Sequence, residues 1–239
     1  MSMSLFKNLI CICLLLLPLS SYAQFGVSAR IQNNSNKAWN NNYQEVSDTS
    51  QNLLNRSYEF GINYWFRLKN YRLEFLPEIS YASSRTEINQ EEFLVNAHTR
   101  TSYNFNINIQ LYPLDFYGDC NCPTFSKDGN MVAKGFYWLF SPGISHHTLS
   151  TEMDPLSSFI PENATATSFR LGIGGGFDMG LTNLITLTPF IQYSMNFGIA
   201  WPEQYSAYAL ANPENDSNRS NINQWHFGIR MIFRPDYKY

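Results

Sequence analysis

Charge is scarce in this chain: Lys and Arg number 16 and Asp and Glu 19 among 239 residues, which is 15% of the sequence, and no basic cluster occurs. A nucleic-acid-binding protein needs concentrated positive charge, so the sequence argues against that class. The absence of a glycine-based or helical repeat excludes collagen and solenoids. A disordered chain would hold fewer aromatic residues than the 16% found here. Low charge together with many Asn, Tyr and Phe residues indicates a folded chain that faces something other than water.

Long apolar runs are also scarce, and the only one lies at the N-terminus. Lys7 precedes the apolar run Leu9–Leu17, and residues 21–23 (Ser-Tyr-Ala) place small side chains at the recognition positions of a cleavage site. These parts predict a secretory signal peptide at residues 1–23 and a mature chain of residues 24–239. A membrane-spanning helix is the alternative, but it needs about 20 apolar residues, roughly twice this run. No later stretch is apolar over about 18 residues, so no spanning helix is predicted.

Cysteine is rare, and two of the four cysteines lie in the predicted signal peptide. The other two, Cys120 and Cys122, form a C-x-C sequence in a chain bound for an oxidising compartment. A disulfide between them would close a small, strained ring, and two ligands are too few for a structural zinc site. We interpret the pair as a local disulfide or as free thiols, and we expect no metal site and no cofactor.

Alternation of apolar and polar residues is the pattern that recurs through the mature chain. Between Tyr58 and Phe66 every second residue is apolar, Glu59 and Asn63 lie on the other face, and Trp65 is the exception. A period of two predicts a β-strand. The same test predicts eight strands, at residues 25–32, 57–67, 71–81, 102–111, 136–145, 169–179, 185–197 and 224–233.

The lengths of these strands and of their connections favour a membrane barrel. Strands of about 8 to 14 residues match or exceed the roughly 9 to 11 that cross a bilayer, whereas soluble strands average about 5 to 6. Long connections alternate with short ones, as in outer-membrane barrels with long outer loops and short periplasmic turns. The predicted outer loops are residues 34–56, 83–98, 149–165 and 198–222. Residues 113–134 depart from this pattern, because they form a long segment on the predicted periplasmic side.

The polar faces of the strands distinguish a barrel from a soluble β-sandwich. A sandwich would present many Lys and Glu residues to water, but these faces are rich in Asn, Ser, Thr and Gly with few charges of either sign. Such faces suit a narrow polar lumen, in which charges removed from water need partners. We therefore predict a charge network in the lumen, formed by Arg30, Glu59, Arg67, Arg72, Glu74, Glu78, Arg170, Asp178 and Arg230. A soluble secreted sandwich or a lipocalin-like binder is the alternative.

A cleavable signal, eight alternating strands and the last strand Trp225–Phe233 together resemble the small outer-membrane β-barrels of Gram-negative-type bacteria, the OmpA/OmpX-like or porin-family proteins. The resemblance implies an all-β fold, an eight-stranded antiparallel up-and-down transmembrane barrel. It also implies that Phe233 is the assembly signal read by the barrel-assembly machinery. The chain departs from that pattern in its tail, residues 234–239, which follow the last predicted strand.

Two other motifs have candidate chemistry. The glycine-rich run Gly172–Phe177 lacks the third Gly of a dinucleotide loop and no helix follows, so small residues facing a crowded lumen explain it better. Ser145, His146, His147 and Glu152 offer the residue types of a lipid A hydrolase. Adjacent residues on a strand point to opposite faces, so Ser145 and His146 do not readily pair. We predict no catalytic residues and no enzyme activity.

The sequence thus predicts a monomeric outer-membrane barrel in contact with membrane lipid. An eight-stranded barrel has an interior just wide enough for side chains to fill, so a structural, surface-binding or adhesion role is favoured over a general porin. A narrow-pore porin for small solutes is the first alternative, and a lipid A-modifying hydrolase is the second.

Overall fold

A computed structural model describes eight stretches of the chain. They are residues 24–36, 56–68, 71–87, 95–116, 134–153, 163–182, 184–200 and 219–233. The predicted signal peptide, Cys120, Cys122 and most of the 113–134 segment lie outside them. No helix in these stretches is long and apolar enough to cross a membrane.

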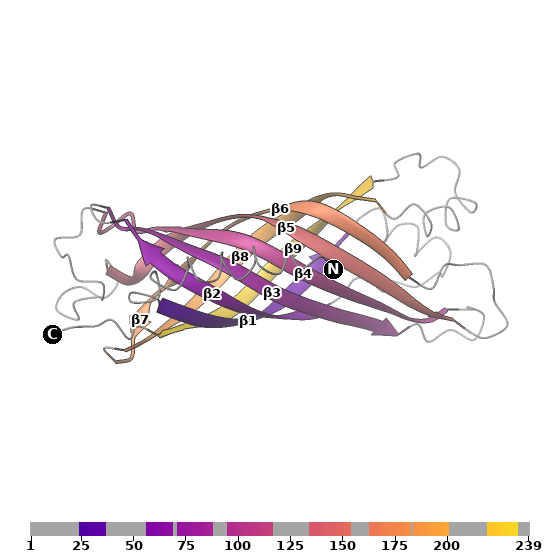
Figure 1. Cartoon of the computed structure of the whole chain (residues 1–239), viewed down its shortest axis with the longest axis horizontal. Coiled ribbons are helices and arrows are strands. Elements are labelled where there is room, and N and C mark those ends of the chain that lie inside the picture. Colours follow the sequence, from indigo (N-terminus) through magenta and orange to yellow (C-terminus); the bar gives the residue numbers. More distant parts are fainter. Residues whose placement is uncertain are drawn as a thin grey trace, which may run out of the picture.

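The described residues form one antiparallel sheet, in which strands adjacent along the chain also pair (Figure 1). Alternating residues with many aromatic and β-branched side chains suit these strands, because such side chains pack well on a pleated surface. The strands are β1 (Gln24–Ser35), β2 (Arg56–Arg67), β3 (Leu73–Glu87), β4 (Val95–Leu111), β5 (Phe136–Met153), β6 (Asn163–Phe177), β7 (Met179–Gly180), β8 (Ile185–Ala200) and β9 (Arg219–Phe233).

The sheet closes on itself, because β1 pairs with both β2 and β9 and because β6 pairs with β8. The short strand β7 continues β6 in the same register against β8, after an interruption at Asp178. The two segments therefore make one stave of the barrel, and the barrel has eight staves. This confirms the predicted fold, a closed eight-stranded antiparallel up-and-down barrel without an open edge.

The register sets the tilt of the strands. Paired residues followed around the barrel from Phe66 of β2 return to β2 at Arg56, which is ten positions away. With ordinary strand spacings, this stagger over eight staves corresponds to a tilt of roughly 40°, within the range of closed barrels. The barrel is long, and its strands cross obliquely to its axis (Figure 1).

The two ends of the barrel differ. Gln24 and Phe233 lie at one end, which we call the terminal end. At the other end, which we call the loop end, strands are joined through residues 37–55, 88–94, 154–162 and 201–218. Toward the loop end, the strands extend beyond the predicted boundaries: β3 reaches Glu87, β4 begins at Val95 and β5 reaches Met153. Parts of the segments predicted as loops are therefore strand.

Candidate functional site

The outward face of the barrel is apolar over a band of about nine residues in most strands, for example from Tyr58 to Phe66 and from Trp225 to Phe233. Its side chains are strongly exposed, with Phe60 at 63% and Ile62 at 67%. At a tilt of roughly 40° this band, which we call the apolar belt, is about 23 Å tall, close to the band of outer-membrane barrels. Exposed apolar surface on this scale marks a surface that contacts a membrane or another protein.

The apolar belt ends abruptly toward the loop end. Its last side chains include an aromatic row formed by Tyr58, Tyr81, Tyr103, Phe169 and Trp225. Two residues further along the same strands, the outward positions are polar: Arg56, Ser83, Thr101, Thr167 and Asn223. Some of the aromatic side chains contact one another. The ring centroids of Tyr81 on β3 and Tyr103 on β4 are 5.3 Å apart. An aromatic row at a polar boundary is typical of the membrane interface.

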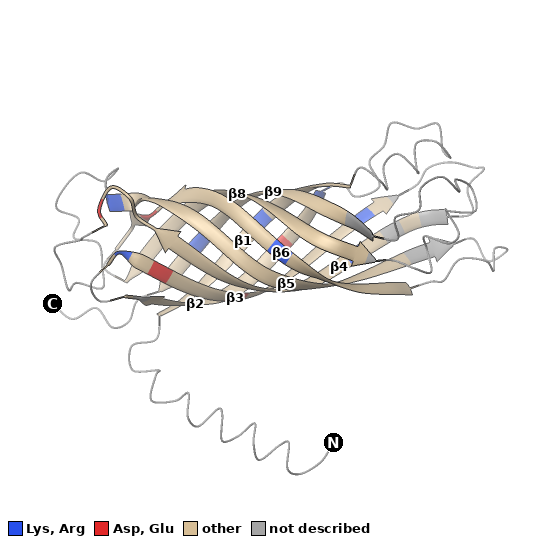
Figure 2. Ribbon diagram, turned by 90° about the horizontal axis from the view of Figure 1, so that it is seen from above, with Lys and Arg blue, Asp and Glu red and all other residues tan. Residues whose placement is uncertain are grey.

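The inward face is polar and buried, and a network of charged side chains fills its middle. We call this the central charge network; it consists of Arg30, Glu59, Glu78, Arg170, His226 and Arg230. These residues come from five strands, so the network ties separate staves together through the lumen. Figure 2 shows charged positions of both signs along the barrel strands.

Glu59 is the principal acceptor of the central charge network. Its Oε2 lies 3.5 Å from Nη2 of Arg170, 3.9 Å from Nε of Arg30 and 3.8 Å from Nδ1 of His226. Gln32 and Ser80 also donate hydrogen bonds to this carboxylate. A buried carboxylate with this many partners offsets much of its desolvation cost, provided that the surrounding donors stay in place.

Glu78 is the second acceptor of the network. It forms an ion pair with Arg30 and accepts a hydrogen bond from Ser28 at 3.1 Å, and Nη2 of Arg230 lies 4.0 Å from its Oε2. Two guanidinium groups lie over the ring of Phe190, with Cζ of Arg30 at 5.3 Å and Cζ of Arg230 at 5.1 Å from the ring centroid. Cation–π contacts of this kind are stronger away from water, so Phe190 supports both arginines.

A second polar cluster lies at the terminal end. Arg72 pairs with Asp115, and its Nη2 donates to the carbonyl of Lys134 at 2.5 Å. The hydroxyl of Tyr112 lies 2.5 Å from Oδ2 of Asp178 and 3.1 Å from Oε2 of Glu74. These contacts hold the start of the 113–134 segment, through Tyr112 and Asp115, and its end, through Lys134, against the barrel wall.

Buried apolar side chains fill the lumen beside this cluster. Trp65, Leu76 and Ile232 pack together, and Tyr112, Tyr137, Leu139 and Phe190 form a second group. Nε1 of Trp65 donates to Oε2 of Glu74 at 2.6 Å, so the one inward aromatic side chain of β2 has a polar partner. The lumen is therefore packed with side chains near the terminal end.

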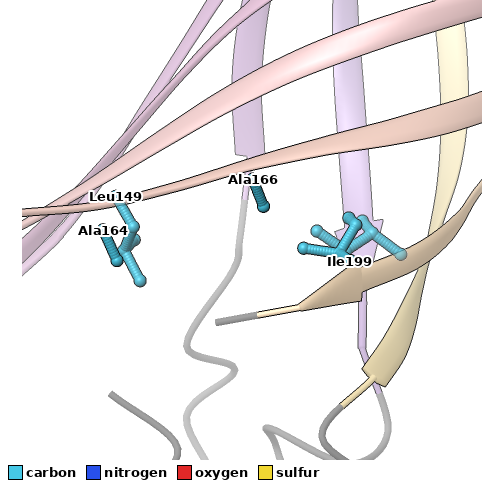
Figure 3. Close-up of a cluster of buried hydrophobic side chains, with 5 residues drawn as sticks. Leu149, Ala164, Ala166 and Ile199 are labelled. Atoms are coloured by element: carbon cyan, nitrogen blue, oxygen red, sulfur yellow. The ribbon is translucent and has the colours of Figure 1, made fainter. Parts of the chain in front are cut away.

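The loop end of the lumen holds a third apolar group. We call Leu149, Ala164, Ala166, Ile199 and Ile222 the loop-end apolar cluster. Its side chains extend from the barrel wall into the interior (Figure 3). Closer to the centre, His147 bridges two serines, with Nδ1 2.7 Å from Oγ of Ser102 and Nε2 3.0 Å from Oγ of Ser168. Apolar, polar and charged layers thus follow one another along the lumen.

The structure places eight of the nine predicted lumen charges in the interior, all buried: Arg30, Glu59, Arg72, Glu74, Glu78, Arg170, Asp178 and Arg230. They form two groups rather than one network, because Arg72, Glu74 and Asp178 belong to the terminal end. The side chain of Arg67 lies outside the described part. Phe233 ends β9, opposite Phe25, and is 48% exposed on the outward face.

Several buried residues of the lumen were missed by sequence reasoning. His226 and His147 lie on the inward face of their strands, and Arg100 lies in a segment predicted as partly loop. The signal that identifies His226 is its place on the polar face of the predicted strand Gln224–Phe233. Trp65 is the exception to the alternation of β2, and the sequence gave no sign that it is buried in the lumen. Its hydrogen-bond partner cannot be identified from its position on a polar face.

The residues considered for hydrolase chemistry are separated by the barrel wall. Ser145 and His147 are buried on the inward face, whereas His146 is exposed and its Nδ1 lies 3.0 Å from Oγ1 of Thr167. The hydroxyl of Ser145 has no hydrogen-bond partner among the described residues. The side chain of Glu152 lies outside the described part.

The glycine-rich run lies within strand β6, and no helix follows it in the described part of the chain. A Cβ added at Gly176 would lie 2.2 Å from the hydroxyl of Tyr137, and one at Gly174 would lie 2.2 Å from the carbonyl of Ile191. The glycines therefore provide room in a packed lumen, which agrees with the structural interpretation of this run.

Comparison with known proteins gives structural neighbours but no family. No family model matches it, and no curated protein matches it. Among solved structures, Ail, the attachment invasion locus protein of Yersinia pestis, was solved with the heparin analogue sucrose octasulfate; it is 10% identical with a TM-score of 0.48, over 88% of this chain and 97% of that chain. Neisserial surface protein A is 12% identical with a TM-score of 0.44, over 87% and 95%.

A third structure, a major outer membrane protein from Thermus thermophilus, is 10% identical with a TM-score of 0.44, over 88% of this chain and 99% of that chain. These are small outer-membrane barrels, the group that the sequence resembles. The strand register of this chain establishes its barrel fold independently of them.

Proposed function

We propose that this chain is an outer-membrane β-barrel with a closed lumen and a structural or surface-binding role, with its loop end facing outside. The observation that supports a membrane location is the apolar belt, which ends at an aromatic row and is followed by outward polar positions. A soluble sandwich or lipocalin-like protein would bury its apolar face and expose the polar one, which is the reverse of this arrangement.

The contents of the lumen support a role other than general transport. Apolar side chains pack near both ends, and the central charge network crosses the middle. A solute would have to displace ion pairs that hold separate staves together. The surface-binding role therefore belongs to the loop end, where β4 and β5 extend well beyond the aromatic row.

A narrow pore for small solutes is a second candidate. Amide groups of Asn63, Asn106 and Asn108 include buried atoms without a hydrogen-bond partner among the described residues. Buried polar groups of this kind normally bind ordered water, so the lumen is expected to be partly hydrated. Continuous hydration along the barrel would support conduction of small ions.

Electrophoresis of the outer-membrane fraction, with and without boiling, tests the membrane barrel, because closed membrane barrels resist SDS until heated. A heat-dependent mobility shift in that fraction is the expected result. A soluble periplasmic protein without a shift would overturn the proposal. Planar-bilayer recording then separates the two candidates: absent unitary conductance supports the closed barrel, and regular unitary steps support the narrow pore.

The proposal includes no enzymatic activity, and lipid analysis tests that part. Cells that express the protein are expected to keep the lipid A acylation pattern of cells without it. If the pattern changes on expression and reverts with His147→Ala, the hydrolase interpretation replaces this one.

A further inference from the structure

Arg100 differs from the other arginines in the middle of the lumen, because it is buried without a carboxylate partner among the described residues. Its side chain comes from β4 at the loop end, and the residue is 2% exposed. Nη2 donates to Oδ1 of Asn34 at 3.0 Å, while Nε and Nη1 have no hydrogen-bond partner in the described part of the chain. By contrast, Arg30 and Arg170 lie within 4 Å of the Glu59 carboxylate.

A buried guanidinium of this kind carries a large desolvation cost that one amide oxygen does not offset. Buried charges in proteins are paired or bound to ions, because their removal from water is costly even after the surroundings relax. Among the described residues, the one hydrogen-bond partner of the Arg100 guanidinium is the neutral amide of Asn34. Within that part of the chain, no carboxylate forms an ion pair with this guanidinium within 4 Å.

Apolar residues lie beside Arg100 in the register of the sheet. Arg100 faces Leu149 in the register of β4 and β5, and Leu149 faces Ala164 in the register of β5 and β6. All three residues are buried and point inward. Leu149 and Ala164 belong to the loop-end apolar cluster, which Ile199 and Ile222 complete from β8 and β9 (Figure 3).

Toward the middle of the barrel, the next inward positions are polar. Ser102 lies two residues from Arg100 on the same inward face and contacts His147, which also contacts Ser168. An anionic group next to Arg100 would thus meet a cation and neutral polar groups on one side. A short apolar group would meet aliphatic side chains on the other side.

We propose that the loop end of the lumen binds a small anionic amphiphile, with a carboxylate or phosphate head on Arg100 and an apolar tail against the loop-end apolar cluster. This inference deepens the proposed function, on which it rests for the outward orientation of the loop end. The head supplies the missing negative charge, and the tail replaces contacts among the aliphatic side chains. Both parts are needed for tight binding.

Titration calorimetry on the mature chain in lipid nanodiscs tests this site with three probes: octanoate, acetate and octanol. We expect saturable binding of octanoate, with acetate and octanol each at least tenfold weaker. Arg100→Gln is expected to weaken octanoate at least tenfold while leaving octanol unchanged. Leu149→Asn is expected to reduce octanoate affinity to the acetate level. Octyl phosphate in place of octanoate distinguishes a phosphate head from a carboxylate.

Arg56→Gln is the matched control, because Arg56 is exposed on the outward face near the same end of the barrel. This variant should bind octanoate as the unchanged protein does. Equal octanoate affinity in Arg100→Gln and Arg56→Gln, or no saturable binding of any probe, would overturn the inference. The heat-dependent mobility shift is recorded for every sample, and only variants that keep it are compared. A folded barrel without binding rejects this site alone, whereas absence of the shift in the unchanged protein rejects the membrane barrel.

Discussion

Glu59 and Arg170 meet across the lumen from opposite walls of the barrel, with 3.5 Å between Oε2 and Nη2. The two residues lie on β2 and β6, which are separated by three staves on either side. A contact of this kind cannot form on a flat sheet, and it places an ion pair across the middle of the barrel. It is one of the contacts on which the proposed closed lumen depends.

We predict that Glu59→Gln destabilises the barrel by about 3 kcal/mol or more, because it leaves buried guanidinium groups without their carboxylate. Urea unfolding in lipid vesicles, followed by tryptophan fluorescence, measures the effect. The double variant Glu59→Gln and Arg170→Met should lose less than the sum of the two single variants, since the pair is coupled. Strictly additive losses would show that the contact contributes nothing.

Much of this arrangement could be predicted from the sequence, because a strand with two different environments alternates in hydropathy. The inward positions of Arg30, Glu59, Glu78 and Arg170 follow from that alternation alone. The ion-pair partners of these residues cannot be predicted in this way, because pairing across the lumen depends on the stagger of the strands around the barrel. The separation of Arg72 into a cluster at the terminal end also depends on the register and on Asp115, which lies outside any predicted strand.

The strand ends were harder to predict, because the surroundings of the outward face change near the loop end. Beyond the aromatic row the outward side chains become polar, as at Thr101 and Thr167, while the strand continues. Both faces are then polar and the alternation disappears, so the extensions of β4 and β5 resemble loops in the sequence. Arg100 lies in one of these extensions, which explains why its burial was missed.

The apolar belt predicts a strong dependence of stability on depth. Ile107 lies midway between Tyr103 and Leu111 on the outward face of β4, so Ile107→Arg should cost about 2–4 kcal/mol, the range for a cation near the bilayer midplane. Thr101→Arg, on the same face but beyond the aromatic row, should cost about 0–1 kcal/mol. Unfolding in vesicles compares the two, and equal costs would contradict the lipid-facing belt.

The glycine-rich run of β6 offers a test with a matched control two residues away. A Cβ at Gly174 would meet backbone atoms of Ile191 and Gln192 at 2.2 and 2.8 Å, whereas one at Gly172 would first meet the amide nitrogen of the Gln192 side chain. A side-chain amide moves more easily than a paired backbone. We therefore expect Gly174→Ala to cost about 1–3 kcal/mol and Gly172→Ala clearly less. The reverse order in urea unfolding would refute the packing explanation.

Phe233 allows assembly to be separated from stability. It ends β9 beside Phe25 and is 48% exposed. Met231 lies on the same outward face and is 45% exposed. Replacing either residue with Ser removes outward apolar surface of similar kind, so in vitro stability should fall by about 1–2 kcal/mol in both variants. If Phe233 is also the signal for assembly, Phe233→Ser should reduce the amount of heat-modifiable barrel in cells several-fold, while Met231→Ser does so much less. Equal reductions in cells, with equal stability in vesicles, would assign Phe233 a packing role alone.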